Sequence, residues 1–111
     1  MRRTFIQAAV FSRRLDERHR PGLLEEIERE ILQNPQAGDV IPGTGGVRKI
    51  RVTDELRRKG KRGGHRALFL DLPDRQRTFL LYLYGKDESE DITPGQKKQI
   101  LALVSAIKRE R

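Results

Sequence analysis

Nearly all of the net charge of this chain lies in one basic segment, residues 47–66, VRKIRVTDELRRKGKRGGHR. The segment carries nine Lys and Arg residues against two carboxylates, a net charge of +7 in a chain whose total is +8. Its first residues alternate as a β-strand does, so Lys49 and Arg51 are expected on one face and Arg48 on the other. Cations held on a strand have fixed positions, and fixed positive charge is how proteins bind phosphates.

A second group of cations in the same segment is interrupted by glycine. It consists of Arg57, Arg58, Lys59, Lys61 and Arg62. Together with Arg48, these cations are predicted to bind RNA or the ribosome through phosphates, independently of base sequence and with a strong salt dependence. The alternative is a mobile, solvated loop, and such a loop can also become ordered on binding.

The residues that could transfer protons lie at the ends of predicted strands. His65 is one candidate because histidine titrates near neutral pH, although strand alternation directs it away from the neighbouring Arg66. Tyr84 could stack on a base or orient a 2′-hydroxyl, whereas packing is the ordinary role of a strand tyrosine. Four carboxylates then follow within five residues: Asp87, Glu88, Glu90 and Asp91. They could supply a general base or form a solvated acidic loop.

The composition argues against several other kinds of site. The chain has no cysteine, and His19 and His65 lie far apart, so we expect no disulfide, no metal site and no cofactor.

No stretch approaches the ~20 apolar residues of a membrane span. The apolar run at residues 5–11 is too short, and too soon followed by arginines, for a signal peptide. A cytoplasmic protein with a polyanionic partner, nucleic acid first, is therefore expected.

The remaining periodicity predicts a single α+β domain over residues 1–111. Strands are expected at residues 4–8, 47–53, 65–72 and 78–86, and helices at residues 9–18, 23–34 and from 94 onwards. Thr93, Pro94 and Gln96 form the capping box of the last helix. The order is β-α-α-β-β-β-α, with helices packed on a small, largely antiparallel sheet. The GTGG run in the loop at residues 36–46 lacks the lysine and the helix of a nucleotide-binding loop, so it is predicted to be a structural turn.

Three pieces of sequence occur together in the second half of the chain: GTGGVRKIRV, GKRGGHRALFLDL and FLLYLYGK. With the Gln/Lys-rich terminal helix that follows, they resemble the RelE superfamily of bacterial type II toxins, and most closely its HigB-like branch. The resemblance covers residues 34–111 well and the N-terminal helical hairpin in outline. It implies a compact RelE-like domain with the element order given above.

The resemblance also implies a function, that of a ribosome-dependent mRNA endoribonuclease, or mRNA interferase. RelE-like toxins enter the A site of the 30S ribosomal subunit and cleave mRNA there, without a metal, through attack of a 2′-hydroxyl on the adjacent phosphate. A cognate antitoxin silences them, and in the HigB-like branch it usually has a helix-turn-helix domain. The expected partners are therefore the ribosome, mRNA and a helix-turn-helix antitoxin.

The motif of the superfamily falls on four basic residues of this chain. They are Lys49, Arg51, Arg66 and Lys86, and the resemblance implies that they bind the scissile phosphate and transfer protons.

Two positions depart from the superfamily pattern. Asp87 stands where RelE-like enzymes often have arginine, and Thr93 stands where they often have tyrosine. Two other functions therefore stay open. One is that of ParE-like toxins, which share the fold, lack the catalytic set and bind DNA gyrase. The other is that of a passive RNA- or ribosome-binding domain.

Overall fold

A computed structural model describes residues 3–52, 64–85, 88 and 91–110 of the chain. This part contains three α-helices, one 3₁₀-helix and a five-stranded sheet. In chain order the elements are β1 (Thr4–Gln7), α1 (Ala9–Arg18), α2 (Leu23–Gln33), β2 (Asp39–Val40), β3 (Arg48–Val52), β4 (His65–Leu72), η2 (Pro73–Arg75), β5 (Arg77–Gly85) and α3 (Pro94–Arg109).

The sheet is mixed, with its strands in the order β1-β5-β4-β3-β2. β1 is parallel to β5, and the other neighbouring pairs are antiparallel. The predicted α+β class and the largely antiparallel sheet are therefore confirmed.

The predicted order is wrong in one element. The chain forms β2 in a segment that was expected to be a loop, so the described order is β-α-α-β-β-β-β-α. Both residues of β2 are exposed, and two residues are too few to show strand alternation. β2 exists because it pairs with Arg48 and Lys49 of β3. Gly38, just before it, has a φ of 78°, and a Cβ there would lie 2.1 Å from the backbone oxygen of Lys49.

The other element boundaries lie close to the predicted ones. α1 and β4 match at both ends, and α2 ends at Gln33, one residue early. β5 begins at Arg77 and ends at Gly85, and the predicted last residue of that strand, Lys86, lies outside the described residues. Within the described part of the chain, no helix is long and apolar enough to span a bilayer.

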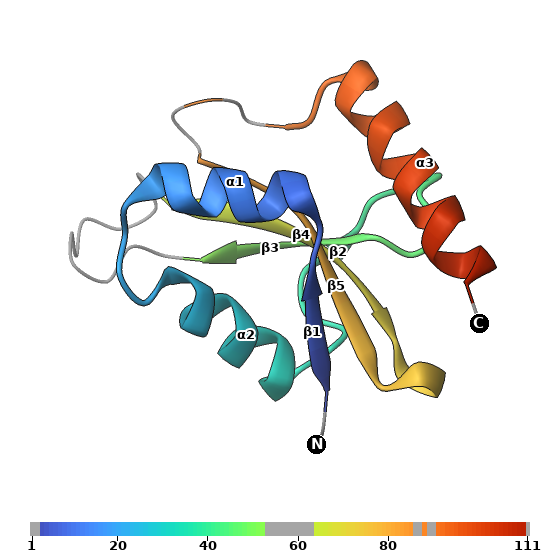
Figure 1. Ribbon diagram of the computed structural model, residues 1–111, viewed down its shortest axis with the longest axis horizontal. Helices are drawn as coiled ribbons and strands as arrows, with labels where there is room; N and C mark the ends of the chain where they lie inside the picture. Colours follow the sequence, from blue (N-terminus) through green and yellow to red (C-terminus); the bar gives the residue numbers. More distant parts are fainter. Residues whose placement is uncertain (1–2, 53–63, 86–87, 89–90, 111) are drawn as a thin grey trace.

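The two faces of the sheet carry separate hydrophobic clusters. α1 and α2 cover one face through Phe11, Leu23, Ile27 and Ile31. α3 covers part of the other face through Ile100, Val104 and Ile107. Figure 1 shows this arrangement, with α1 and α2 on one side of the strands and α3 on the other. β4 and β5 are central strands with both faces buried, which explains their almost continuous apolar sequences.

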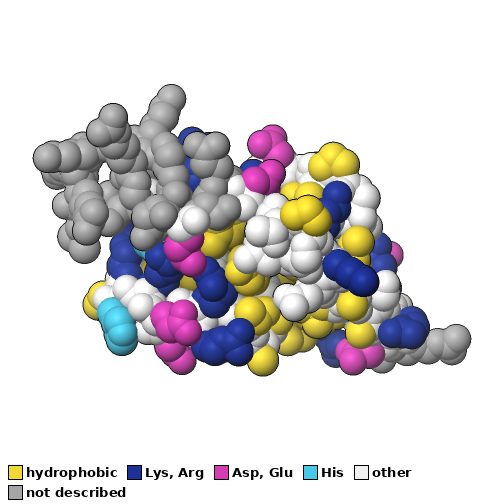
Figure 2. Space-filling model, turned by 90° about the horizontal axis from the view of Figure 1, so that it is seen from above, with side chains coloured by type: hydrophobic (Ala, Val, Ile, Leu, Met, Phe, Trp, Pro, Cys, Tyr) yellow, Lys and Arg dark blue, Asp and Glu magenta, His cyan; other side chains and the backbone are white. Residues whose placement is uncertain are grey.

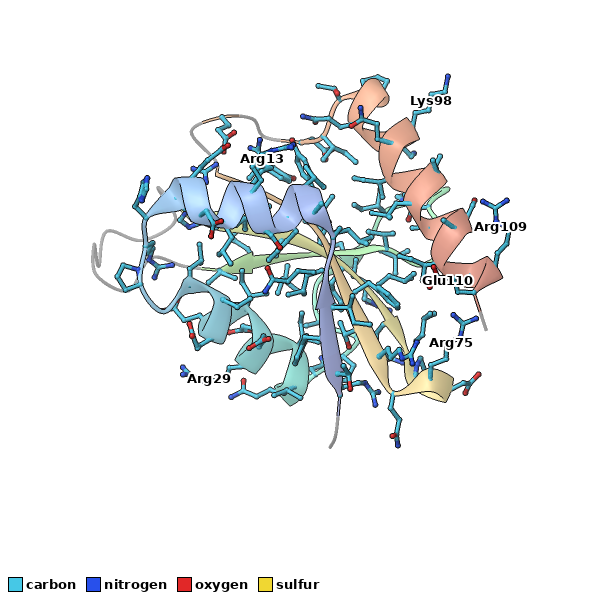
Figure 3. All side chains as sticks on the ribbon, viewed as in Figure 1. Arg13, Arg29, Arg75, Lys98, Arg109 and Glu110 are labelled. Atoms are coloured by element: carbon cyan, nitrogen blue, oxygen red, sulfur yellow. The ribbon has the colours of Figure 1, made fainter. Side chains whose placement is uncertain are left out.

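Side chains secure both ends of α3. The predicted capping box is present, because Thr93 Oγ1 accepts from the backbone N–H of Gln96 (3.1 Å) and Gln96 Oε1 accepts from that of Thr93 (2.8 Å). At the other end, Arg75 Nη1 donates to the backbone oxygen of Ile107 (3.0 Å). Figure 3 shows Arg75 beside the C-terminal end of the helix. A cation there satisfies free carbonyls and complements the helix dipole.

The GTGG run forms a turn that packs against α3. Thr44 Oγ1 donates to the backbone oxygen of Ile41 (2.6 Å) and accepts from the backbone N–H of Val47 (3.2 Å). Lys108 Nζ donates to the backbone oxygen of Gly45 (2.6 Å). These hydrogen bonds agree with the predicted structural turn.

Candidate functional site

Three residues form a row across the three central strands at one end of the sheet. Arg51 of β3 lies directly opposite Arg66 of β4, and Arg66 lies directly opposite Tyr84 of β5. Directly opposite residues have Cβ atoms about 4.5–5.5 Å apart. Lys49 belongs to the same face, two residues from Arg51. Below, Lys49, Arg51 and Arg66 are called the cationic patch.

A β-bulge places Tyr84 on this face. The register between β4 and β5 shifts between Leu68 and Phe69, because Leu68 pairs with Tyr82 while Phe69 pairs with Leu80. Leu81 is the extra residue, and it packs in the same cluster as Tyr82 and Tyr84. Strict alternation from Leu80 would have directed both tyrosines to the opposite face.

Arg66 is a buried cation at the centre of the row. It is 5% exposed, and Nη1 donates to the backbone oxygen of Gly64 (3.3 Å). Among the described residues, no carboxylate forms an ion pair with it. A buried charge without a counterion is costly, and a guanidinium can bind phosphate with two parallel hydrogen bonds. Arg66 is therefore well suited to hold a phosphate.

Tyr84 offers a buried hydroxyl beside Arg66. The side chain is 2% exposed, and its hydroxyl has no hydrogen-bond partner among the described residues. Burial raises the pKa of Tyr84 above its ordinary value; nearby Asp91 and Tyr82 raise it further, while Arg66 opposes them. The phenol therefore stays protonated at neutral pH and acts as a hydrogen-bond donor rather than a base.

A hollow of about 240 Å³ opens beside this row. Its lining residues come from α1, β5, the segment after β5 and the start of α3. They are Arg14, Tyr82, Tyr84, Glu88, Asp91, Thr93 and Gln96. Two contacts stabilise the wall around Tyr82: Gln96 Nε2 donates to its hydroxyl (2.9 Å), and the Arg14 guanidinium lies 4.7 Å from its ring centre.

The acidic segment after β5 contacts the cations around the hollow. Glu88 pairs with Arg14 and Arg18 of α1, and it also accepts from the backbone N–H of Gly85 (3.0 Å). Asp91 Oδ1 lies 3.8 Å from Lys49 Nζ. In the space-filling view, Lys and Arg side chains lie beside Asp and Glu side chains on the same side of the molecule (Figure 2).

The structure separates the predicted site residues into three groups. Lys49, Arg51, Arg66 and Tyr84 share one face of the sheet. His65 and Arg48 lie on the opposite face by strand alternation, the face of α1 and α2. Lys86, Arg57, Arg58, Lys59, Lys61 and Arg62 lie outside the described residues.

Arg48 has a structural contact of its own. Its Nη1 donates to the backbone oxygens of Gln36 (2.9 Å) and Gly38 (3.3 Å), which lead into β2. Its assignment to RNA binding stays a prediction.

Sequence reasoning missed Arg14 and Gln96. Arg14 reaches the hollow because α1 follows β1 along the edge of β5, where Arg14 Nε donates to the backbone oxygen of Leu83. No local pattern signals this approach. Gln96 was identified as a capping residue, and its second role, the contact with Tyr82, depends on how α3 packs on the sheet.

A larger depression, of about 420 Å³, lies at the turn between α1 and α2. Its lining includes His19, Pro21 and Leu24, and none of its residues adjoins the cationic patch, whereas the smaller hollow contains Tyr84, opposite Arg66, and Asp91, beside Lys49. We therefore take the cationic patch, together with the hollow beside Tyr84, as the candidate site.

Within the candidate site, the cationic patch can hold a phosphate, and the hydroxyl of Tyr84 can donate a hydrogen bond to a neighbouring group. No group of three or more His, Cys, Asp or Glu residues that could bind a metal occurs within the described residues. No protein-family model matches the chain.

Proposed function

We propose that this protein is the toxin of a type II toxin–antitoxin system and cleaves mRNA on the ribosome. The observation that carries the proposal is the cationic patch, three basic side chains on one rigid sheet face beside a buried tyrosine hydroxyl. Rigid strands hold charged groups in place before the substrate arrives, and this preorganisation is the largest contribution to many enzymatic rate enhancements. The resemblance of the second half of the chain to RelE-like toxins supplies the substrate class.

In the proposed reaction, the 2′-hydroxyl of a nucleotide attacks the adjacent phosphorus. The new O2′–P bond forms as the P–O5′ bond breaks, which leaves a 2′,3′-cyclic phosphate and a 5′-hydroxyl. The attacking hydroxyl loses one proton, and the departing O5′ gains one. Arg66, with Lys49 and Arg51, stabilises the extra negative charge on the phosphorane.

The proton transfers can be divided among the available groups. Tyr84 remains protonated at neutral pH, so it is a hydrogen-bond donor and not the base. The proton that the departing O5′ gains then comes from Lys49 or Lys86. The base that receives the proton of the 2′-hydroxyl is then Lys49, Lys86 or a carboxylate of the acidic segment. His65 is the weakest of the original candidates, because alternation directs it to the opposite face from Arg66.

The proposal includes the partners and location that the resemblance implies. These are the A site of the 30S subunit, mRNA, a helix-turn-helix antitoxin and the cytoplasm. The positive net charge of +8 favours association with ribosomal RNA through counterion release.

A reconstituted translation reaction with one defined mRNA tests the proposal. The purified chain should produce new mRNA 5′ ends within the codon in the A site, only when ribosomes are present, and Arg66→Ala should not. A gyrase supercoiling assay runs in parallel. Inhibition of gyrase without mRNA cleavage would establish the ParE-like alternative. Ribosome binding without either activity would establish the passive RNA-binding domain.

A further inference from the structure

The size and lining of the hollow beside the cationic patch are not explained by phosphate binding alone. Its volume, about 240 Å³, is smaller than the roughly 300–1,000 Å³ of pockets for drug-sized ligands. Two tyrosines and the guanidinium of Arg14 line it, together with polar groups at its edge. Its size and lining suit one small, planar, polar group.

The hydroxyl of Tyr84 is the unexplained group in this lining. It is buried and has no partner among the described residues, whereas the hydroxyl of Tyr82 accepts a hydrogen bond from Gln96. Buried polar groups are nearly always paired, and an unpaired one in a native protein calls for an explanation. A bound ligand that supplies the missing hydrogen-bond partner would explain the unpaired hydroxyl of Tyr84.

We propose that the hollow holds one nucleobase of the RNA strand whose phosphate lies on the cationic patch, with the hydroxyl of Tyr84 as its recognition group. The inference rests on the proposed function. Unstacked RNA bases are bound by stacking on aromatic rings or guanidinium planes and by hydrogen bonds to their edges. The lining of the hollow offers all three.

The charge of the lining favours a base over a second phosphate. The lining itself carries one cation, Arg14, against two carboxylates, Glu88 and Asp91, and Glu88 is paired with Arg14 and Arg18. Asp91, whose side chain is 70% exposed, adds a carboxylate at the edge. A phosphate inside the hollow would meet two carboxylates, whereas a neutral base meets hydrogen-bond acceptors.

Asp91 also sets the kind of base. An ionised carboxylate only accepts hydrogen bonds, so it favours bases that carry an exocyclic amino group. Guanine, adenine and cytosine have such a group, whereas uracil can offer a carboxylate only its ring N3–H. The hollow should therefore discriminate against uracil.

Calorimetric titration of the purified full-length chain with mononucleotides tests this inference without ribosomes. The probes are the 3′-monophosphates of guanosine, adenosine, cytidine and uridine, with ribose 5-phosphate and inorganic phosphate as base-free probes. We expect at least one amino-bearing nucleotide to bind at least about tenfold more tightly than the uridine nucleotide and both base-free probes. Equal affinities for all six probes, or no saturable binding in the millimolar range, would overturn the inference.

Two variants locate the binding. Tyr84→Phe should weaken binding of the favoured nucleotide about three- to tenfold and leave inorganic phosphate unaffected. Asp91→Asn should reduce the preference for the favoured nucleotide over the uridine nucleotide. Asp74→Asn, at the exposed turn η2, should leave that preference unchanged. If Tyr84→Phe melts no lower than the wild type and binds every nucleotide as the wild type does, the base lies elsewhere.

The failure of this inference and the failure of the proposed function are distinguishable. Cleavage of ribosome-bound mRNA together with equal binding of all mononucleotides overturns only the base site. Selective nucleotide binding that depends on Tyr84, without cleavage or arrest of translation, retains the base site and overturns the endoribonuclease.

Discussion

Tyr82 and Tyr84 lie on the same sheet face with ring centres 6.0 Å apart, yet their hydroxyls have opposite environments. The hydroxyl of Tyr82 accepts a hydrogen bond from Gln96, and the hydroxyl of Tyr84 is buried without a partner among the described residues. Two chemically identical side chains thus differ in the hydrogen bonding of their hydroxyls. The difference provides an internal control for the role of Tyr84.

The two tyrosine-to-phenylalanine variants should change stability in opposite directions. Tyr84→Phe removes an unpaired buried hydroxyl, so it should raise the free energy of unfolding, by up to about 1–3 kcal/mol. Tyr82→Phe leaves Gln96 Nε2 without its acceptor and should lower it by about 0.5–1.5 kcal/mol. Urea unfolding of both variants provides the measurement. A loss of stability in Tyr84→Phe equal to that in Tyr82→Phe would mean that the Tyr84 hydroxyl is paired within the protein.

The raised pKa of Tyr84 predicts a pH dependence of stability. In the unfolded chain the phenol titrates near its ordinary pKa of about 10. In the folded protein burial favours the neutral form, so below about pH 10 neither state ionises and stability does not depend on this group. As the pH rises through the folded pKa, the unfolded state gives up its proton more readily and stability is lost.

This loss of stability at alkaline pH should be smaller in Tyr84→Phe, which has no ionisable group at that position. Urea midpoints of the two proteins, compared between pH 8 and pH 11, isolate the contribution, because all lysines and Tyr82 are common to both. Parallel curves over that range would contradict a buried, neutral Tyr84.

Arg66→Ala should abolish most of the mRNA cleavage while the fold is retained. The loss of one preorganised charge donor typically lowers the rate by about 10²–10³-fold. Arg77→Ala is the matched control, because Arg77 is an exposed arginine at the opposite end of β5. Single-turnover cleavage on programmed ribosomes measures the effect, and unchanged circular dichroism checks the fold. Wild-type cleavage by Arg66→Ala would remove Arg66 from the site.

Lys49 and Arg48 are adjacent cations on opposite faces of β3, so they test which face binds RNA. Lys49→Gln and Arg48→Gln remove the same charge within one residue of each other. If the face of the cationic patch binds RNA, Lys49→Gln should weaken binding and reduce the slope of log affinity against log salt by about 0.7–0.9. Arg48→Gln should change the slope less, and filter binding over a salt series compares the two. A larger slope change for Arg48→Gln would assign RNA binding to the opposite face.

Gly38 should tolerate alanine less well than Gly22 does. Both have positive φ, 78° and 82°, so alanine is strained at either position by about 1–2 kcal/mol. A Cβ at Gly22 would contact nothing within 4 Å, whereas at Gly38 it would lie 2.1 Å from the backbone oxygen of Lys49. The free energy of unfolding should therefore fall further in Gly38→Ala, by at least about 1 kcal/mol more than in Gly22→Ala. Similar values for the two variants would mean that the segment before β2 can move away from β3 without a loss of stability.

Local sequence patterns determined the helices, the long strands and the shared face of Lys49 and Arg51. The spacing of Leu23, Ile27 and Ile31 defines the buried face of α2, and the capping residues define the start of α3. Alternation along β3 is enough to place Lys49 and Arg51 on the same face. These features depend on residues a few positions apart, so the sequence alone predicts them.

The tertiary structure alone decided which groups join the cationic patch. The run FLLYLY is almost continuously apolar because both faces of β5 are buried, so it contains no alternation that could reveal the extra residue at Leu81. The bulge, and with it the face on which Tyr84 lies, depends on how β5 pairs with β4. Arg14 reaches the hollow through a contact with Leu83, which lies far from it in the chain. The short, exposed strand β2 forms only because it pairs with β3. Their positions depend on register and packing, which local patterns do not encode.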